Sequence, residues 1–314
     1  MKVEKNTNKR RHIMNGYRKK QLSLWSFCII PMLLTLVFSY IPMAGIIIAF
    51  KDFRYDKGVF GSKWVGLDNI RFFFESDEFF RITWNTLSMN FMFIVAGMAC
   101  AVGVAVLLFE LKSRMKVKVF HTVLLTPHFI TWVLVSYIVY GFLNPEYGTI
   151  NNLLARLGMD KISFYTIPEI WPGILLIVSI WKHVGMDSVM YYATLMGLDE
   201  SLFEAAYLDG ASEWQKARYI TIPSLIPIIS LLLIMKVGGI FRADFGLFYQ
   251  IPRNVGALYK TTDVIDTYIF RSLNTLGNVG MSASVGLLQS VVGFMLILVT
   301  NWAVKKVDPD GGLF

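Results

Sequence analysis

Long charge-free apolar runs constrain this chain more than any other feature of its sequence. Four runs exceed the roughly 20 residues that a helix needs to cross a hydrocarbon core of about 30 Å. They cover residues 22–50, 82–109, 119–143 and 281–304. Of all residues, 55% are hydrophobic and only 17% are charged, which is not typical of a water-soluble globule. The sequence therefore predicts an all-α integral membrane protein.

Two further segments are weaker candidates for spans because charged residues interrupt them. Residues 170–195 contain Lys182 and Asp187, and residues 224–245 contain two cations and an acid. If both segments cross, the chain has six transmembrane helices, at about 22–50, 82–109, 119–143, 170–195, 224–245 and 281–304. Residues 22–304 then form the transmembrane domain, with 196–223 as its longest cytoplasmic loop.

Basic residues near the ends of the spans predict the orientation. Residues 1–21 carry eight Lys and Arg, and residues 110–118 carry four. Such clusters remain on the cytoplasmic side of a membrane, so we expect cytoplasmic tails at 1–21 and 305–314. The first run is far longer than the 7–15-residue apolar region of a signal peptide, so we expect it to remain as an anchor.

Several classes of function are disfavoured. The net charge of +8 fits basic cytoplasmic loops, and no groove-binding motif accompanies it, so we expect no nucleic-acid partner. Cys28 and Cys100 lie in apolar runs, and neither they nor the four histidines have metal-ligand spacing. The chain has no phosphate loop for ATP. We therefore expect no enzyme activity, no metal and no cofactor on this chain.

Residues 196–223 carry the most specific pattern. Residues 201–204 and 212–215 each have the form of a capping box, which predicts two short helices. Gly210 suits a left-handed end to the first helix, and Pro223 is expected to end the second. Small residues around the turn keep its tip thin. We call residues 196–223, with these two short helices and the turn between them, the knuckle. A thin helical segment of this kind fits a groove of another protein.

The spacing in this knuckle resembles that of a known family. Glu204-Ala205-Ala206 is followed after three residues by Gly210, and after nine more by Ile220 and then Ile222-Pro223. This pattern resembles the EAA loop of binding-protein-dependent ABC importer permeases, although the family has Leu where this chain has Ile222. Flanking runs resemble the sugar branch of the family, and the carboxyl-terminal pair resembles its polysaccharide or aldouronate permeases. These runs are 66–69, 85–87, 148–151, 180–181, 209–212 and 313–314.

The resemblance implies a type I ABC importer permease-like fold in a bacterial inner membrane, in contact with lipid. It implies a second permease, making a hetero- or homodimer, two cytoplasmic ATPases that bind ATP, and an extracellular solute-binding protein. It also implies that the knuckle couples this chain to the ATPase. The implied coupling residues are Glu204, Ala205, Ala206, Asp209, Gly210, Ile220 and Pro223.

Other interpretations remain open. Glu204 could simply cap a helix, and the chain could be a permease for peptides or amino acids. An ion-coupled secondary transporter would use internal repeats, which are not obvious here, and a membrane scaffold or receptor would transport nothing. Transport without an ATPase would favour the secondary transporter.

Charges in the two weak spans are candidates for a substrate pathway. Three cations, Lys182, Lys236 and Arg242, accompany two acids, Asp187 and Asp244. Lys182 and Asp187 are five residues apart and could pair loosely. An uncompensated cation inside a membrane is costly unless it is paired or hydrated. The surplus therefore predicts a hydrated cavity that favours an acidic sugar oligomer.

Overall fold

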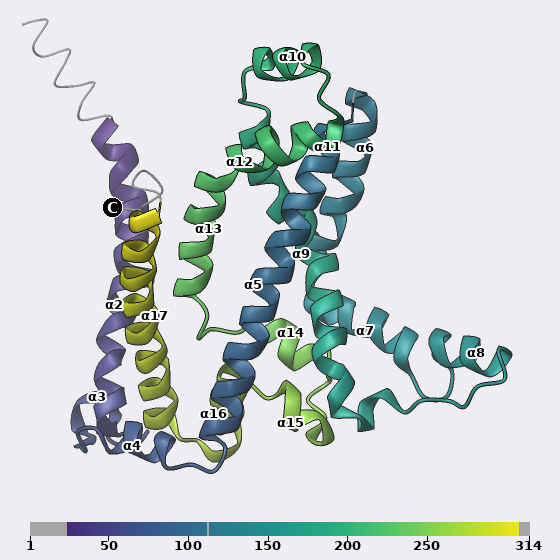
Figure 1. The fold of residues 1–314 in the computed structure, drawn as a ribbon. Helices are drawn as coiled ribbons and strands as arrows, with labels where there is room; N and C mark the ends of the chain where they lie inside the picture. The colour runs from purple at the N-terminus through teal and green to yellow at the C-terminus, as the bar shows by residue number, and fades with distance from the viewer. Residues whose placement is uncertain (1–23, 112, 308–314) are drawn as a thin grey trace, which may run out of the picture. The chain divides into compact units, whose positions relative to one another are not determined.

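The computed structural model describes residues 24–111 and 113–307, which are mostly helical (Figure 1). The predicted tail at 1–21 and the pair 313–314 lie outside the described residues. The described part divides into two compact units. The first unit comprises residues up to Arg71 together with Asn278–Leu287, and the second comprises Phe72–Gly277 together with residues from Leu288 onward.

The first unit holds the predicted first span. Helical structure runs over Leu24–Phe50 and leads into a short antiparallel pair of strands, in which Lys51 faces Trp64. The Asn69 side chain ties this turn together, because its amide donates to the carbonyls of Ala49 and Lys51 at 2.9 and 3.0 Å. The elements are η1 (Leu36–Tyr40), α2 (Ile41–Met43), η2 (Ala44–Phe50), β1 (Lys51–Asp52), α3 (Gly58–Gly61), β2 (Lys63–Trp64) and α4 (Asp68–Phe74).

The second unit is built on two long helices that pack side by side, α5 and α9 (Figure 1). The knuckle helices α10 and α11 lie at one end of this pair, and α14, α15 and α16 lie towards the other end (Figure 1). The elements are α5 (Phe79–Phe109), α6 (Arg114–Leu125), η3 (Thr126–Phe129), α7 (Trp132–Leu143), α8 (Thr149–Arg156), η4 (Phe164–Thr166), η5 (Pro168–Ile170), α9 (Trp171–Leu195), α10 (Glu200–Leu208), α11 (Glu213–Lys216), η6 (Ala217–Thr221), α12 (Ile222–Ser224), α13 (Ile226–Gly238), α14 (Phe245–Gln250), η7 (Gly256–Leu258), α15 (Tyr259–Thr262), α16 (Ile265–Leu276) and the part of α17 (Val279–Val307) that follows Leu287.

Among the described residues, four helices are long and apolar enough to cross a membrane, and up to six if each bent pair counts as one span. The four are Leu24–Phe50, Phe79–Phe109, Pro168–Leu195 and Val279–Lys306. The weak candidate at 170–195 is thus one of the four, whereas the strong run at 119–143 is not a single helix. Its pair, Arg114–Phe129 and Trp132–Leu143, bends by 99°.

The predicted fifth span also differs from the structure. The helix does not end at Pro223, because Glu213–Ser224 forms one arm of a pair that bends by 54° before Ile226–Gly238. Pro223 follows the π-helical stretch η6 and lies in the three-residue helix α12, so the arm ends one residue after the proline, at the bend. Arg242 and Asp244 follow the end of α13, so they lie outside the helix that was predicted to contain them.

Two apolar clusters hold α5 against α9 at separate levels. One cluster includes Met89 and Val178, and the other is built from Ala101, Tyr191 and their neighbours. Between these levels, residues 90–97 of α5 and 179–187 of α9 are not part of either buried cluster. The interval between the clusters is where a cavity opens.

Candidate functional site

The knuckle consists of two capped helices, as the sequence predicts. Ser212 caps α11 in a full capping box, in which the Gln215 side chain accepts the Ser212 N–H at 2.7 Å. The first cap is different from the prediction, because Asp199, not Ser201, precedes α10 and accepts the Ser201 N–H at 3.0 Å. Hydrogen bonds from the Ser201 backbone and hydroxyl lower the pKa of Asp199. The carboxylate thereby stays charged at the amino end of α10, where the helix dipole favours it.

Gly210 ends the first helix with a left-handed backbone, at a φ of +76°. The Gly210 and Ala211 N–H groups return to the carbonyls of Tyr207 and Ala206, which closes the end of α10. The side chains of Glu204, Ala205 and Asp209 are exposed. The Glu204 side chain makes no hydrogen bond among the described residues, and the residue that caps α10 is Asp199.

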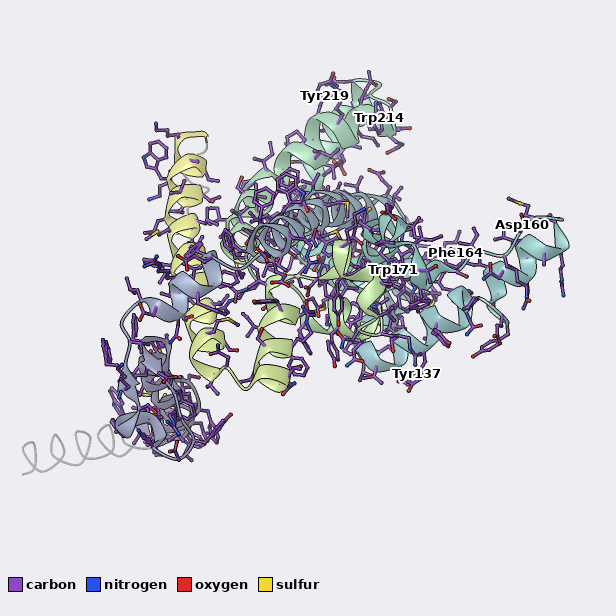
Figure 2. The ribbon with its side chains drawn as sticks, turned by 90° about the horizontal axis from the view of Figure 1, so that it is seen from below. Tyr137, Asp160, Phe164, Trp171, Trp214 and Tyr219 are labelled. Atoms are coloured by element: carbon purple, nitrogen blue, oxygen red, sulfur yellow. The ribbon has the colours of Figure 1, made fainter. Side chains whose placement is uncertain are left out.

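The surface of the knuckle combines exposed apolar side chains with shallow depressions. Trp214 and Tyr219 project at one end of the unit (Figure 2), and each is about 70% exposed. One depression of about 310 Å³ lies between α10 and η6, and its lining includes Gly210 and Ile220. A second, of about 540 Å³, lies along α10 beside Glu204. Apolar side chains around a thin turn are the composition expected of a protein-binding surface.

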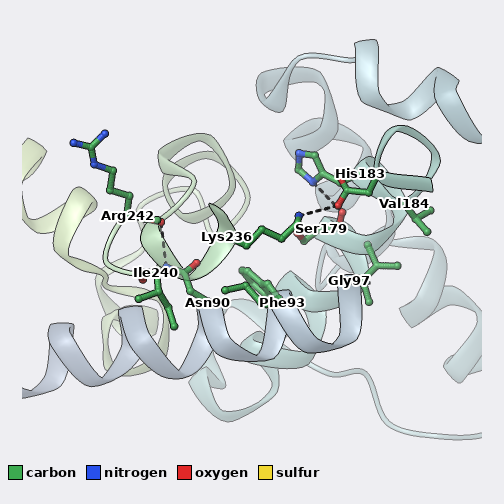
Figure 3. Close-up of a pocket in the computed structure, with 13 residues that line it drawn as sticks. Asn90, Phe93, Gly97, Ser179, His183, Val184, Lys236, Ile240 and Arg242 are labelled. Carbon is green, nitrogen blue, oxygen red and sulfur yellow. Dashed lines mark hydrogen bonds and ion pairs between the residues drawn. The ribbon is translucent and has the colours of Figure 1, made fainter. Parts of the chain in front are cut away.

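A cavity of about 250 Å³ opens between α5, α9 and the end of α13 (Figure 3). The two long helices contribute Asn90 from α5, and Ser179, His183 and Asp187 from α9, to its polar lining. The Asn90 amide donates to the carbonyls of Ile240 and Arg242, which pins the chain after α13 to α5. The His183 Nδ1 lies 3.0 Å from the Ser179 carbonyl oxygen of its own helix.

Two of the predicted pathway cations line this cavity. Lys236 reaches from α13 towards α9, where its Nζ lies 3.0 Å from Asp187 Oδ2 (Figure 3). The two side chains are 37% and 30% exposed, so the pair borders open space. The guanidinium of Arg242 points away from Asn90 and Phe93 (Figure 3) and donates to the Ser290 hydroxyl at 2.9 Å.

The other two predicted residues lie elsewhere. Lys182 is only 5% exposed and does not line the cavity. Its ammonium donates to three carbonyls at the break between η3 and α7, those of Pro127, His128 and Ile130. Asp244 caps α14 through the Leu247 N–H and accepts from the Trp132 indole at 3.1 Å.

The expected loose pair of Lys182 with Asp187 is therefore wrong. Lys182 is held by carbonyl dipoles, Asp187 pairs with Lys236, and Asp244 caps a helix. The three cations and two acids therefore do not line one cavity together: Lys182 and Asp244 lie outside it. Of the two cations that line the cavity, Lys236 pairs with a carboxylate, and Arg242 bonds none in the part of the chain that the structure describes.

Sequence reasoning named Asp187 but missed other polar residues of the cavity. Ser179 and His183 precede Asp187 at intervals of four residues, which places all three on one face of α9. Asn90 and Gly97 share a face of α5 in the same way. This helical spacing is the sequence signal that could have identified these residues as one face of a cavity. Among residues 24–111 and 113–307, no group of three His, Cys, Asp or Glu side chains could hold a metal ion.

A family model described as "Binding-protein-dependent transport system inner membrane component" matches residues 85–310. This match covers most of the chain, and with the fold and the knuckle it assigns the class. The chain belongs to this family of ABC importer permeases. It is a multi-pass membrane transport subunit and not an enzyme.

Individual relatives agree with this assignment. The chain is 32% identical to Protein LplB of Bacillus subtilis (strain 168), over 93% of this chain and 92% of the relative. It is 30% identical to the polygalacturonan/rhamnogalacturonan transport system permease protein YteP of the same organism, over 88% and 85%. A chain in the crystal structure of a bacterial ABC transporter involved in the import of the acidic polysaccharide alginate is 32% identical, with a TM-score of 0.82. That likeness covers 92% of this chain and 97% of the other.

Proposed function

We propose that this chain forms half of the translocation pathway of an ATP-driven importer for an acidic sugar oligomer. The observation that carries the proposal is the pairing of two features in one unit: a capped helical knuckle with exposed aromatics, and a polar cavity between the long helices. The knuckle binds the cytoplasmic ATPase and transmits its conformational change to the membrane helices. The cavity borders the path of the solute.

The coupling role rests on the form of the knuckle. Gly210 lets the chain turn with no side chain at its tip, and the residues flanking it leave a depression into which a partner can fit. Trp214 and Tyr219 offer large apolar area for anchoring. Glu204, Ala205, Ala206 and Asp209 occupy the same surface, and Ile220 and Pro223 connect it to α13.

The substrate class rests on charge and on the relatives. Lys236 and Arg242 place two cations at the cavity against the single carboxylate of Asp187. YteP is named for transport of polygalacturonan and rhamnogalacturonan, and the similar structures belong to an importer of alginate. All three names refer to polysaccharides that contain uronic acid, which carries a carboxylate at neutral pH.

The remaining partners follow from the proposed division of labour. A second permease, identical or different, completes the pathway, and two cytoplasmic ATPases bind and hydrolyse the ATP, so that no cofactor is bound by this chain. An extracellular solute-binding protein delivers the oligomer. A similar solved structure contains an alginate importer with a pentasaccharide-bound periplasmic protein. The assembly resides in the bacterial inner membrane.

Coupling is tested in proteoliposomes that contain the assembled transporter with its ATPase and binding protein. Gly210→Val should abolish uptake, because the knuckle then carries a bulky side chain on a left-handed backbone. Gly158→Val is the matched control, since Gly158 has a φ of +75° and, like Gly210, no neighbour within 4 Å of an added Cβ. Equal uptake by the two variants would contradict the coupling role. Uptake by the chain without an ATPase would instead favour a secondary transporter.

The substrate class is tested by comparing acidic and neutral oligomers of equal length in the same vesicles. Arg242→Gln should reduce uptake of the acidic oligomer more than that of the neutral one, and Lys236→Gln should do the same to a smaller extent because Asp187 already faces that cation. Equal losses for both oligomers would contradict the assignment of an acidic substrate. Uptake of peptides or amino acids by the parent would replace it.

A further inference from the structure

A second polar cavity, of about 230 Å³, lies apart from the one between α5 and α9. It opens between α7, the end of α14 and the connection that follows α14, a region that the charge pattern places on the outer side of the membrane. The two cavities share no lining residue. The polar members of its lining are Ser136, Tyr137, Tyr249, Gln250, Arg253 and Asn254.

Arg253 is the only charged residue in this lining. Its guanidinium lies 4.2 Å from the centre of the Tyr140 ring and 5.7 Å from that of Tyr137. A guanidinium stacked on a ring uses its flat face and leaves its N–H groups, which lie in the plane, for another partner. No acceptor bonds these N–H groups within the described part of the chain. The arrangement is therefore an arginine presented for an acceptor that the chain does not supply.

The backbone that carries Arg253 adopts an uncommon conformation. Arg253 and Asn254 both have positive φ angles, of 57° and 52°, although neither is glycine. Two consecutive residues of this kind are costly, and such conformations persist where the surrounding structure imposes them. Buried Ile251 precedes the turn, and the Tyr259 hydroxyl donates to Asn254 Oδ1 at 2.9 Å. The position of Arg253 is thus fixed by its neighbours.

A chain of contacts supports Tyr259 in turn. The Arg271 guanidinium lies over the Tyr259 ring at 4.3 Å and binds the buried carboxylate of Asp263 at 2.7 Å. Asp263 also accepts from Arg81 at the start of α5. The turn at Arg253 is therefore tied to one of the two long helices. A site held in this way is preorganised, which reduces the entropy lost on binding.

Resting on the proposed function, we propose that this cavity is an outer subsite that takes one uronate residue of the oligomer. The carboxylate accepts two N–H groups of Arg253, a geometry for which the planar guanidinium is suited. The Tyr137 ring, 62% exposed, offers an apolar face to the sugar ring. Gln250 and Asn254 bring amides within the same cavity for the hydroxyl groups. The subsite binds solute before it reaches the cavity at Asp187 and Lys236.

The test uses the assembled transporter in proteoliposomes, with tetragalacturonate, tetramannuronate and fully methyl-esterified tetragalacturonate as probes. Arg253→Gln should raise KM for the acidic tetramers by about tenfold or more, as expected for loss of a charge-assisted pair, and change KM for the ester by less than about twofold. Arg253→Lys should recover part of the loss, because it keeps the charge without the fork. Tyr137→Ala should raise KM for all three probes.

Arg156→Gln is the matched control, since it removes the same charge from an exposed position on α8, outside the cavity. If Arg156→Gln and Arg253→Gln have equal effects, a general attraction of anions replaces the subsite. An unchanged KM in Arg253→Gln overturns the subsite while the proposed function stands. A parent that takes up neither acidic tetramer overturns the proposed function, and the subsite with it.

Occupancy is measured separately from transport. Val133, which lines the cavity and is 48% exposed, is replaced by Cys in a chain whose exposed Cys28 and Cys100 are Ser. Tetragalacturonate should slow labelling of this cysteine by a membrane-impermeant maleimide, and Arg253→Gln should remove the protection. Labelling that tetragalacturonate does not change overturns the subsite. Absence of labelling in the assembled transporter overturns it too, because the face is then covered by another subunit.

Discussion

The third and fourth predicted spans of the chain, at 119–143 and 170–195, differ from what their sequences predict: the more apolar one is broken, and the one that contains charges is continuous. The third is free of acids and of Lys and Arg over residues 119–143, yet it is broken by 99° between η3 and α7. The fourth contains a lysine and an aspartate, yet α9 is continuous from Trp171 to Leu195. Apolar composition thus predicts which segments lie in a membrane, but not which of them remain single helices.

One residue explains both halves of this contrast. A helix that breaks inside a membrane exposes carbonyls with no water to satisfy them. Lys182 of α9 donates to the carbonyls of Pro127, His128 and Ile130 at the break, and its ammonium lies 5.0 Å from the Trp132 ring centre. The charge that weakens the fourth span as a sequence pattern is therefore the group that lets the third span break. The free-energy cost of placing Lys182 inside a span and the cost of breaking the third span therefore offset each other.

The largest effect is expected from removing this ammonium. Lys182→Met should lower the free energy of unfolding by about 3 kcal/mol, because buried carbonyls lose their donors. The measurement is thermal unfolding of the purified transporter in detergent. Lys236→Met is the matched control, since it removes a lysine whose partner is partly exposed, and it should cost about 1 kcal/mol or less. Equal costs for the two lysines would contradict the structural role of Lys182.

The next effect concerns the close approach of α9 to α6. A Cβ on Gly185 would meet the Leu124 carbonyl and lie 2.8 Å from the Leu125 nitrogen, and these backbone atoms cannot move easily. Gly185→Ala should therefore cost about 1–3 kcal/mol in thermal unfolding. Gly173→Ala on the same helix meets nothing within 4 Å and should be neutral or stabilise by about 0.5 kcal/mol. A neutral Gly185→Ala would mean that the broken span is not held against α9 at this point.

A smaller effect is expected where the second half of the broken span begins. Thr131 caps α7, and its hydroxyl accepts the Leu134 N–H at 3.5 Å. Thr131→Ala should cost about 1 kcal/mol, the usual loss for a helix cap. Thr122→Ala, at an exposed position inside α6 where the hydroxyl bonds only its own helix, should change stability by less than about 0.5 kcal/mol. Equal costs would show that α7 does not depend on its cap.

The smallest effect is a pH dependence at the turn that joins α5 to the broken span. Burial raises the pKa of Glu110, and a hydrogen bond and repulsion from the Glu213 carboxyl raise it further, against the opposing charge of Lys216. The folded state therefore binds this proton more tightly than the unfolded chain, so stability should rise as pH falls through the raised pKa towards 4.5. Unfolding midpoints measured between about pH 7.5 and 5 should show this slope. Glu110→Gln and Glu213→Gln should each flatten it, and a slope that persists in both would assign it to other groups.

The sequence by itself determined the class of fold, the membrane segments and the knuckle. These depend on local features: apolar length, the spacing of Glu204, Gly210 and Pro223, and the capping pair of Ser212 with Gln215. Even here the cap at Asp199 and the helix that runs on past Pro223 differ from the prediction, because a serine or a proline permits more than one local geometry.

The tertiary structure decided what each charge does. Lys182, Asp187, Lys236 and Asp244 form one set in the sequence, yet in the fold they serve a helix break, an ion pair at a cavity and a helix cap. The outer cavity around Arg253 has no signature in the sequence, since it joins α7 to a turn more than a hundred residues later. The partner of a charged group is set by which helices pack together, and that packing depends on contacts between segments that are distant in the chain.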